Sequence, residues 1–146
     1  MTVYQKPGFL TRRVGNPIIA GFTRLGLSMR GSHILEVRGR SSGKVRAMPV
    51  NPLSFQGSRY LVAPRGETHW ARNLRASGGG VLRLGRKREA IAATEVPDTE
   101  KPPILRAYLE RWGAETRAAF GVGKQFSDAE LVAIAPRHPV FRISKS

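Results

Sequence analysis

Cysteine is absent from this sequence of 146 residues, and acidic residues are few. The lack of thiols excludes disulfides, iron–sulfur clusters, thiolate zinc sites and cysteine nucleophiles. The three histidines, His33, His69 and His138, are far apart in the sequence and predict no metal site, so we expect each at the surface or at a helix cap. The sequence therefore favours a function without a resident metal or thiol chemistry.

Long hydrophobic runs are missing too. No apolar segment approaches the roughly 18 residues that a membrane-spanning helix needs, and residues 1–17 contain no signal-peptide core. We expect a soluble, cytoplasmic protein of one domain, with peripheral membrane contact through basic and apolar residues 12–24 as an addition at most.

Positive charge is what the sequence has in excess. Twenty-five Lys and Arg residues against ten Asp and Glu residues give a net charge of +15. This balance predicts an anionic partner, which is a nucleic acid, an anionic membrane, or a phosphorylated or polycarboxylated small molecule.

The order of predicted elements indicates the fold class. Strand-like alternation covers residues 33–40, 44–55, 59–63, 81–84, 89–96 and 140–143. Helical patterns cover residues 17–27, 67–76, 101–112 and 127–135, the last opened by a capping box. Consecutive hairpins followed by helices predict a mainly β protein with flanking helices, built on an antiparallel barrel or sheet rather than on alternating βαβ units.

The stretch from residue 35 to residue 50 combines a turn with unusual charge. Four cations, Arg38, Arg40, Lys44 and Arg46, lie within nine residues with no acid among them. We interpret residues 41–43 as a three-residue hairpin loop whose glycine takes the left-handed conformation.

In that register Arg40 faces Lys44, and Arg38 faces Arg46, so all four cations share one face of the hairpin. Like charges directly opposite each other destabilise a sheet by several tenths of a kcal/mol per pair. We therefore expect an external anion over this face, with the loop amides and the hydroxyls of Ser41 and Ser42 as further donors. The alternative is a solvated cationic face that binds nothing in particular.

Three motifs in series resemble the deazaflavin-dependent nitroreductase and quinone reductase family: GRSSGKVRAMPV (39–50), YLVAPRGE (60–67) and HWARNLRA (69–76). Members of that family are split β-barrels, related to flavin-binding and pyridoxamine-phosphate-oxidase-like barrels, and they use coenzyme F420. The resemblance implies one split-barrel domain with a helical N-terminal extension (1–30), a barrel core (33–97), and helices with a final strand (98–146).

The resemblance also implies the cofactor site. Its hairpin would hold the phosphate and acidic tail of F420, its small-residue turn would lie near the deazaflavin ring, and its W-x-x-N-L helix would complete the site. The implied cofactor-binding residues are Arg40, Ser41, Ser42, Gly43, Lys44, Arg46, Met48, Pro49, Ala63, Pro64, Arg65, Gly66, Trp70, Asn73 and Leu74. Plain core packing is the alternative for Trp70 and Leu74, and a buried amide that ties the helix to a loop is the alternative for Asn73.

The function implied by the resemblance is hydride transfer from reduced F420 to a small hydrophobic, electron-poor acceptor, such as a quinone, a nitro compound or an activated alkene. No catalytic residue is assigned, and we expect a monomer or a homodimer. A flavin (FMN)-using enzyme or a non-catalytic cofactor carrier on the same barrel is one alternative. A basic barrel that binds nucleic acid is another, although no strand interleaves exposed aromatics with its cations.

Overall fold

A computed structural model of the protein, which describes residues 33–123 and 125–146, contains one antiparallel sheet of seven strands. The strands are β1 (His33–Arg38), β2 (Val45–Val50), β3 (Leu53–Phe55), β4 (Ser58–Val62), β5 (Gly79–Leu84), β6 (Lys87–Glu95) and β7 (Val140–Lys145). The helices are α2 (His69–Ser77), η1 (Asp98–Glu100), α3 (Lys101–Phe120), α4 (Asp128–Ile134) and η2 (Ala135–Arg137). The helix predicted over 17–27, and the extension that contains it, lie outside the described residues.

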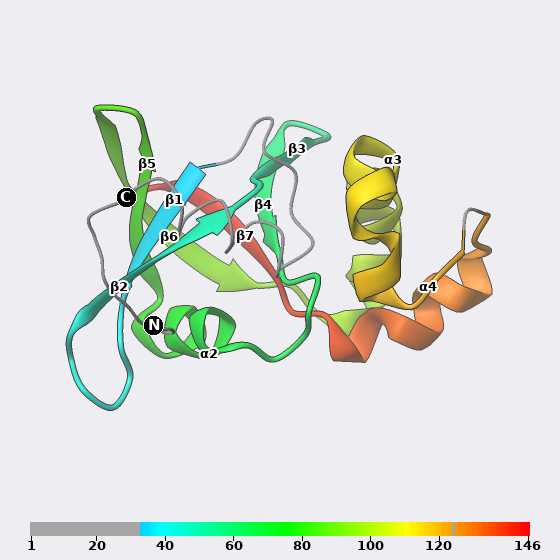
Figure 1. The fold of residues 1–146 in the computed structure, drawn as a ribbon, viewed down its shortest axis with the longest axis horizontal. Coiled ribbons are helices and arrows are strands. Elements are labelled where there is room, and N and C mark those ends of the chain that lie inside the picture. The colour runs from blue at the N-terminus through cyan, green and yellow to red at the C-terminus, as the bar shows by residue number, and fades with distance from the viewer. Residues whose placement is uncertain (1–32, 124) are drawn as a thin grey trace.

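The sheet is curled into a half-barrel, as its strand order requires. The order is β2-β1-β5-β6-β7-β4-β3, so β2 and β3 lie at opposite edges although only Asn51 and Pro52 separate them in the sequence. Two residues span less than about 11 Å, so the sheet must bend until its two edges approach each other (Figure 1). The prediction of one strand over residues 44–55 is wrong at this break.

The barrel interior is filled by alternate residues of the strands and closed at one end by α2. Its buried members are Leu35, Val37, Val50, Leu61, Ala63, Trp70, Ala71, Leu74, Leu82, Ile91, Phe141 and Ile143. Figure 1 shows α2 beneath the sheet and beside the β1–β2 hairpin, whose loop extends beyond the sheet. The predicted mainly β fold with flanking helices is confirmed.

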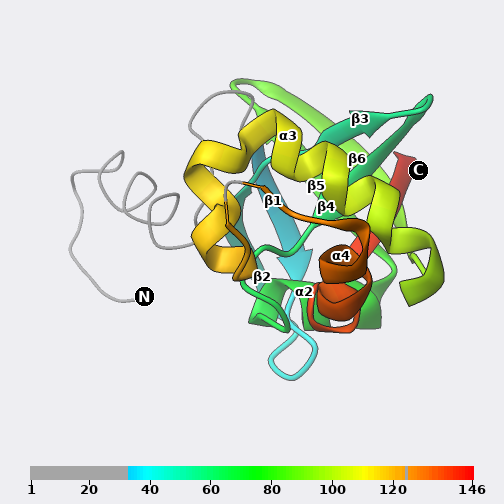
Figure 2. The same ribbon diagram turned by 90° about the vertical axis from the view of Figure 1, so that its right-hand side faces the viewer.

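A second core lies between the sheet and the helices, where α3 contacts β3 and α4 packs against α3. Both helices lie in front of the sheet in Figure 2. The predicted apolar stripe of α3 is confirmed as buried: Ile104, Leu105, Tyr108, Leu109 and Trp112. The helix continues beyond its predicted end to Phe120, with a kink at Trp112 (φ −130°, ψ 23°). The predicted capping box of α4 is present, with Ser127 and Glu130 bonded reciprocally.

Two glycines allow β5 to lie close to both neighbouring strands. A Cβ atom on Gly80 would collide with the backbone oxygen of Glu36 in β1, and one on Gly79 would collide with the backbone oxygen of Ile91 in β6. Glycine has no Cβ, so the three backbones can approach at this point. The strand predicted from residue 81 therefore begins two residues earlier.

Candidate cofactor-binding site

The β1–β2 hairpin closes on a longer loop than the predicted one. Arg38 is opposite Val45, and the backbone nitrogen of Gly39 donates a hydrogen bond to the oxygen of Lys44 (2.7 Å). These contacts leave a four-residue loop, 40–43, in which Gly43 has φ +73°. The left-handed glycine is confirmed, but the loop length shifts the register by one residue.

The prediction that Arg40 faces Lys44, and that Arg38 faces Arg46, is therefore wrong. Arg46 is opposite Val37, which places Arg38 and Arg46 on opposite faces of the hairpin. The repulsion between paired cations that predicted an overlying anion is absent from these strands. The Arg38 guanidinium instead donates to the loop, through Nη1 to the oxygen of Gly43 (2.6 Å).

The register differs because β2 has apolar residues on both faces. Residues 47–50 read Ala-Met-Pro-Val, so alternation alone does not identify the inner side. In the structure Met48 packs against the interior cluster that contains Val50, whereas Val45 is 57% exposed. Pro49 is buried and lies on an edge strand, where the missing N–H removes no bond within the sheet.

A tertiary contact joins the hairpin loop to α2. The side-chain oxygen of Asn73 accepts hydrogen bonds from the backbone nitrogen of Arg40 (3.1 Å) and from its Nη1 (2.7 Å). Asn73 is only 5% exposed, while Arg40 remains exposed. The interpretation of Asn73 as a buried amide that ties the helix to a loop is confirmed.

The four cations of the β1–β2 hairpin, Arg38, Arg40, Lys44 and Arg46, have no carboxylate partner within residues 33–123 and 125–146. The carboxylates that pair with Lys or Arg there are Glu36, Glu67, Glu89, Glu95, Asp98 and Asp128, and their partners all lie outside the hairpin. Lys44 and Arg46 are exposed. Their charge is therefore available to an external anion.

The turn after β4 is held firmly against the segment that leads into β7. The backbone nitrogen of Ala63 donates to the oxygen of Pro139 (2.9 Å), and that of Gly66 donates to the oxygen of Ala63 (3.2 Å). Gly66 has φ +87°, and a Cβ there would lie 3.0 Å from the oxygen of Arg137. Pro64 is buried within the turn, and Arg65 is exposed.

His138 supports this turn from inside the protein, a role that the sequence did not indicate. Its Nδ1 donates to the oxygen of Ala63 (3.0 Å), and its ring lies 4.5 Å from that of Phe120. The expectation that every histidine is at the surface or a cap is wrong here, because His138 is 6% exposed. Burial lowers the pKa of His138 below its usual value.

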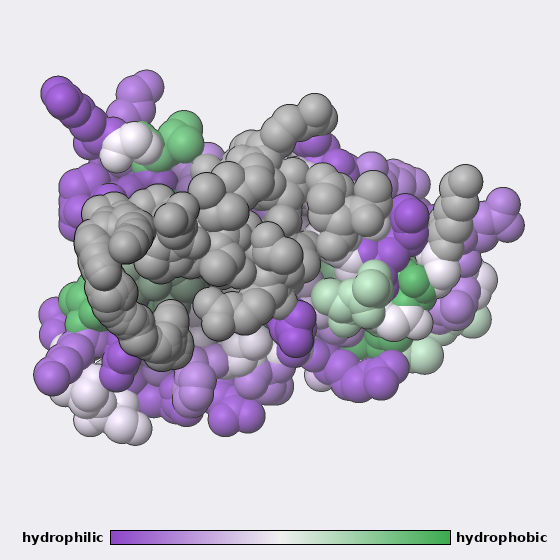
Figure 3. All heavy atoms as spheres, in the orientation of Figure 1, coloured by the Kyte–Doolittle hydropathy of each residue, from purple (hydrophilic) through white to green (hydrophobic). Residues whose placement is uncertain are grey.

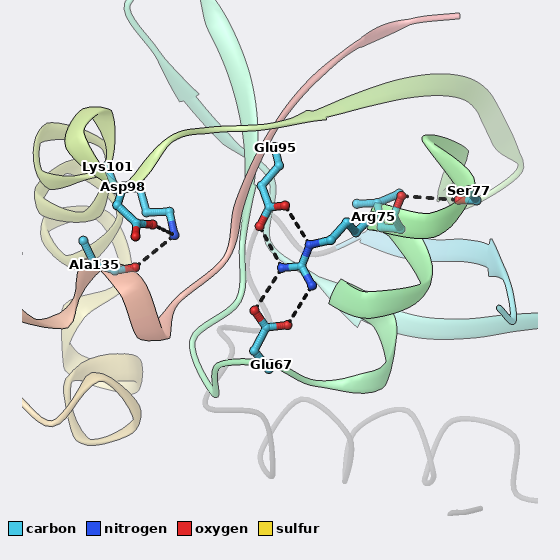
Figure 4. A network of polar contacts seen from close by, with 8 residues as sticks. Glu67, Arg75, Ser77, Glu95, Asp98, Lys101 and Ala135 are labelled. Atoms are coloured by element: carbon cyan, nitrogen blue, oxygen red, sulfur yellow. Dashed lines mark hydrogen bonds and ion pairs between the residues drawn. The ribbon is translucent and has the colours of Figure 1, made fainter. Parts of the chain in front are cut away.

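Helix α2 is fixed by apolar packing on one side and by ion pairs on the other. Trp70, whose ring is 6.4 Å from that of Phe141, and Leu74 belong to the barrel interior. On the outer side Arg75 bonds Glu95 from its Nε (2.7 Å) and Glu67 from its Nη2 (2.9 Å) (Figure 4). The bond from Arg75 lowers the pKa of the Glu67 carboxyl.

A buried amine ties the start of α3 to the end of α4, near the turn that His138 supports. Lys101 is 3% exposed, and its Nζ bonds Asp98 Oδ1 (2.7 Å) and the backbone oxygen of Ala135 (2.9 Å), as Figure 4 shows. Hydrogen bonds of His138 and Pro139 thus hold the turn 63–66, and the bond of Lys101 holds the neighbouring segment at Ala135. His138 and Lys101 were not among the predicted residues.

Ten of the predicted site residues form three groups. Arg40 and Asn73 touch directly, and Ala63, Trp70 and Leu74 share the barrel interior, against which Met48 packs. Residues 41–44 are exposed at the end of the hairpin, where Ser42 Oγ accepts a hydrogen bond from the backbone nitrogen of Lys44 (3.1 Å). On the face drawn in Figure 3 the described surface is mostly hydrophilic.

Solved structures of other proteins share this fold. A structure described as an F420-H2 dependent reductase (FDR-A) is 21% identical with a TM-score of 0.53, and the match covers 79% of this chain and 95% of that chain. A putative pyridoxamine 5′-phosphate oxidase from Listeria innocua is 13% identical with a TM-score of 0.53, covering 91% and 94%. The heme storage protein HutZ from Vibrio cholerae is 16% identical with a TM-score of 0.53, covering 90% and 89%. The fold is the split β-barrel of pyridoxamine-phosphate-oxidase-like proteins.

The family within this class follows from the sequence. The profile described as F420H(2)-dependent quinone reductase matches residues 19–127, and the chain belongs to that family. The resemblance seen in the three motifs is confirmed. No curated protein matches the chain significantly. None of the helices in the described part of the chain is long and apolar enough to cross a membrane.

Proposed function

We propose that the protein is an F420H2-dependent reductase that binds coenzyme F420 across the β1–β2 hairpin, α2 and the turn after β4. The proposed electron acceptor is a small hydrophobic quinone, with nitro compounds and activated alkenes as further candidates of the same electron-poor class. The contact between Arg40 and Asn73 is the observation that carries the proposal, because it joins two of the three family motifs in one place.

The residues present fit this cofactor. F420 carries a phosphodiester and a glutamate tail, so it needs cations that are not already neutralised. This need is met by Arg40, Lys44 and Arg46, since none of the ion pairs among the described residues involves them. The flat ring needs apolar contact, which Met48 and the turn around Pro64 offer in this proposal.

Reduced F420, when bound, supplies the hydride. In our proposal the chain contributes binding and orientation. Lys44 and Arg46 hold the anionic end, and the loop amides of residues 41–43 add donors. The turn 63–66 places the ring, because its bonds to Pro139 and His138 leave it little freedom. Trp70 and Leu74 contribute by anchoring α2 in the barrel interior.

Assembly and location belong to the same proposal. A solved structure described as a domain-swapped dimer, 20% identical with a TM-score of 0.53, covers 91% of this chain and 96% of that chain. This likeness supports a homodimer over a monomer for the protein. The location we propose is the cytoplasm, with contact at a membrane surface as an addition. Light scattering after size exclusion would decide the oligomeric state, and co-sedimentation with vesicles would decide membrane contact.

A binding experiment with matched variants tests the proposal. Fluorescence titration of purified protein with F420 should give saturable binding that the double variant Lys44→Ala, Arg46→Ala weakens at least about tenfold, since hydrogen bonds to charged groups contribute about 1.5–3 kcal/mol each. The control is Arg86→Ala, Lys87→Ala, which removes the same charge from the tip of the β5–β6 hairpin and should bind normally.

Three results would count against the proposal. Equal affinity of the two double variants would remove the hairpin from the site. Tighter binding of FMN than of F420 would favour the flavin-using alternative. Binding of single-stranded DNA with a steep dependence on salt, without saturable F420 binding, would favour the nucleic-acid alternative.

A further inference from the structure

We propose that Asn73 is a positioning residue that acts on the cofactor through Arg40: it fixes the guanidinium with a neutral acceptor and so leaves the full positive charge for the anionic end of F420. This inference rests on the proposed function and refines it. It assigns to Asn73 a role different from the direct cofactor contact that the family motif implied.

The first argument is hydrogen-bonding capacity. An amide oxygen has two lone pairs, and both hydrogen bonds that Asn73 Oδ1 accepts come from Arg40, one from the backbone nitrogen and one from Nη1. The oxygen is therefore fully used, so the only ligand contact that Asn73 could add is a hydrogen bond donated by its Nδ2. At 5% exposure the side chain also offers a ligand little surface.

The second argument is what these two bonds fix. Arg40 is the first residue of the four-residue loop, so the bond to its backbone nitrogen sets where the loop leaves β1. The bond to Nη1 sets the direction of the guanidinium at the same time. Helix α2 is itself held in place by the barrel interior and by the ion pairs of Arg75. Asn73 therefore fixes the position of an otherwise exposed loop relative to a rigid helix.

The third argument is charge. Five arginines of the described residues are held by carboxylates: Arg59, Arg75, Arg83, Arg88 and Arg106. Arg40 is held by an amide. A carboxylate of the same shape would bind the guanidinium more strongly, since charge-assisted hydrogen bonds are roughly twice as strong as neutral ones. It would also cancel the charge, so an amide suits an arginine that must be both oriented and cationic.

Three variants separate the effect of positioning the Arg40 guanidinium from the effect of neutralising its charge. Asn73→Asp keeps both acceptor contacts and adds a negative charge, Asn73→Ala removes the contacts, and Ala76→Asp adds the same charge to an exposed position one turn along α2. The measurements are the dissociation constant for F420 by fluorescence titration, its dependence on salt concentration, and the melting temperature of the free protein.

We expect Asn73→Asp to melt at or above the wild-type temperature and yet to bind F420 about tenfold more weakly at low salt, with a smaller dependence of affinity on salt. Asn73→Ala should lose both affinity and melting temperature. Ala76→Asp should stay near wild type in both. A purely structural role for Asn73 would leave the affinity and the salt dependence of Asn73→Asp unchanged, and that result would overturn the inference.

A double-mutant cycle decides the matter even if Asn73→Asp does not fold. In an Arg40→Ala background, Asn73→Ala should weaken F420 binding much less than it does in the wild type, because the guanidinium is gone and only the bond to the backbone nitrogen of residue 40 is left to lose. An undiminished second loss would show that Asn73 acts without Arg40. If instead Arg40→Ala and the Lys44, Arg46 double variant all bind F420 like the wild type, the proposed site itself fails.

Discussion

The close approach of β1, β5 and β6 makes Gly80→Ala a sharp test of the barrel geometry. A Cβ on Gly80 would lie closer than 3.0 Å to the backbone oxygen of Glu36, with the carbon of the same carbonyl at 3.5 Å and Leu35 Cδ1 at 3.7 Å. The obstacle is backbone rather than a flexible side chain, so relief requires β1 and β5 to separate.

The expected loss of stability has two parts. Overpacking of this kind costs about 1–3 kcal/mol. The φ of Gly80 is not in the left-handed region, so replacing glycine also lowers the entropy of the unfolded chain, which offsets about 0.4–1 kcal/mol. The net destabilisation should be about 1–2 kcal/mol, which at this chain length corresponds to a fall in melting temperature of roughly 3–8 °C.

Denaturant unfolding followed by circular dichroism would measure the change. Gly123→Ala is the matched control, because the nearest atom to its Cβ is the oxygen of Gln125 at 3.9 Å, and it should be as stable as the wild type or slightly more so. The reasoning is refuted if Gly80→Ala is as stable as this control, since β1 and β5 could then not be as close as described.

Three further predictions concern the framework around the site. The folded protein disfavours the charged form of His138 and so lowers the pKa of that residue. The contribution of His138 to stability is therefore complete above the usual pKa of about 6.5 and is lost as the pH falls through the lowered pKa of the folded state. Between pH 7.5 and 5.5 the melting temperature of His138→Gln should fall less than that of the wild type. Lys101→Ala leaves the oxygen of Ala135 without its donor and should destabilise by about 2 kcal/mol in denaturant unfolding. Leu109→Ala should cost about 2–5 kcal/mol, whereas Val132→Ala, at a position 60% exposed, should be nearly neutral in the same assay.

Features governed by local interactions were predictable from the sequence. The capping box of Ser127 and Glu130 and the apolar stripe from Ile104 to Trp112 depend on residues three or four positions apart, and both are present. The order of hairpins before helices was enough to predict an antiparallel, mainly β protein. The family motifs then indicated the split barrel and the family to which the chain belongs.

Features decided by distant contacts were not predictable in the same way. The register of the hairpin depends on which face of β2 the barrel interior accepts, and the Ala-Met-Pro-Val sequence of residues 47–50 is compatible with either. The guanidinium of Arg40 is placed by Asn73, which is far along the sequence and on a helix. The burial of His138 depends on Phe120 and on the turn at Ala63, and nothing beside it in the sequence indicates them. The break at residues 51–52, by contrast, had a visible signal in Pro52.

The position of β7 bears on how the protein forms during synthesis. This strand, residues 140–145, comes last of the seven in the sequence but lies inside the sheet, paired with β6 on one side and β4 on the other. Until β7 has emerged from the ribosome, no strand joins the group β2-β1-β5-β6 to the group β4-β3. The barrel interior that α2 closes at one end therefore cannot form. A nascent chain should therefore stay sensitive to protease until those residues are out, and then become resistant in a single late step.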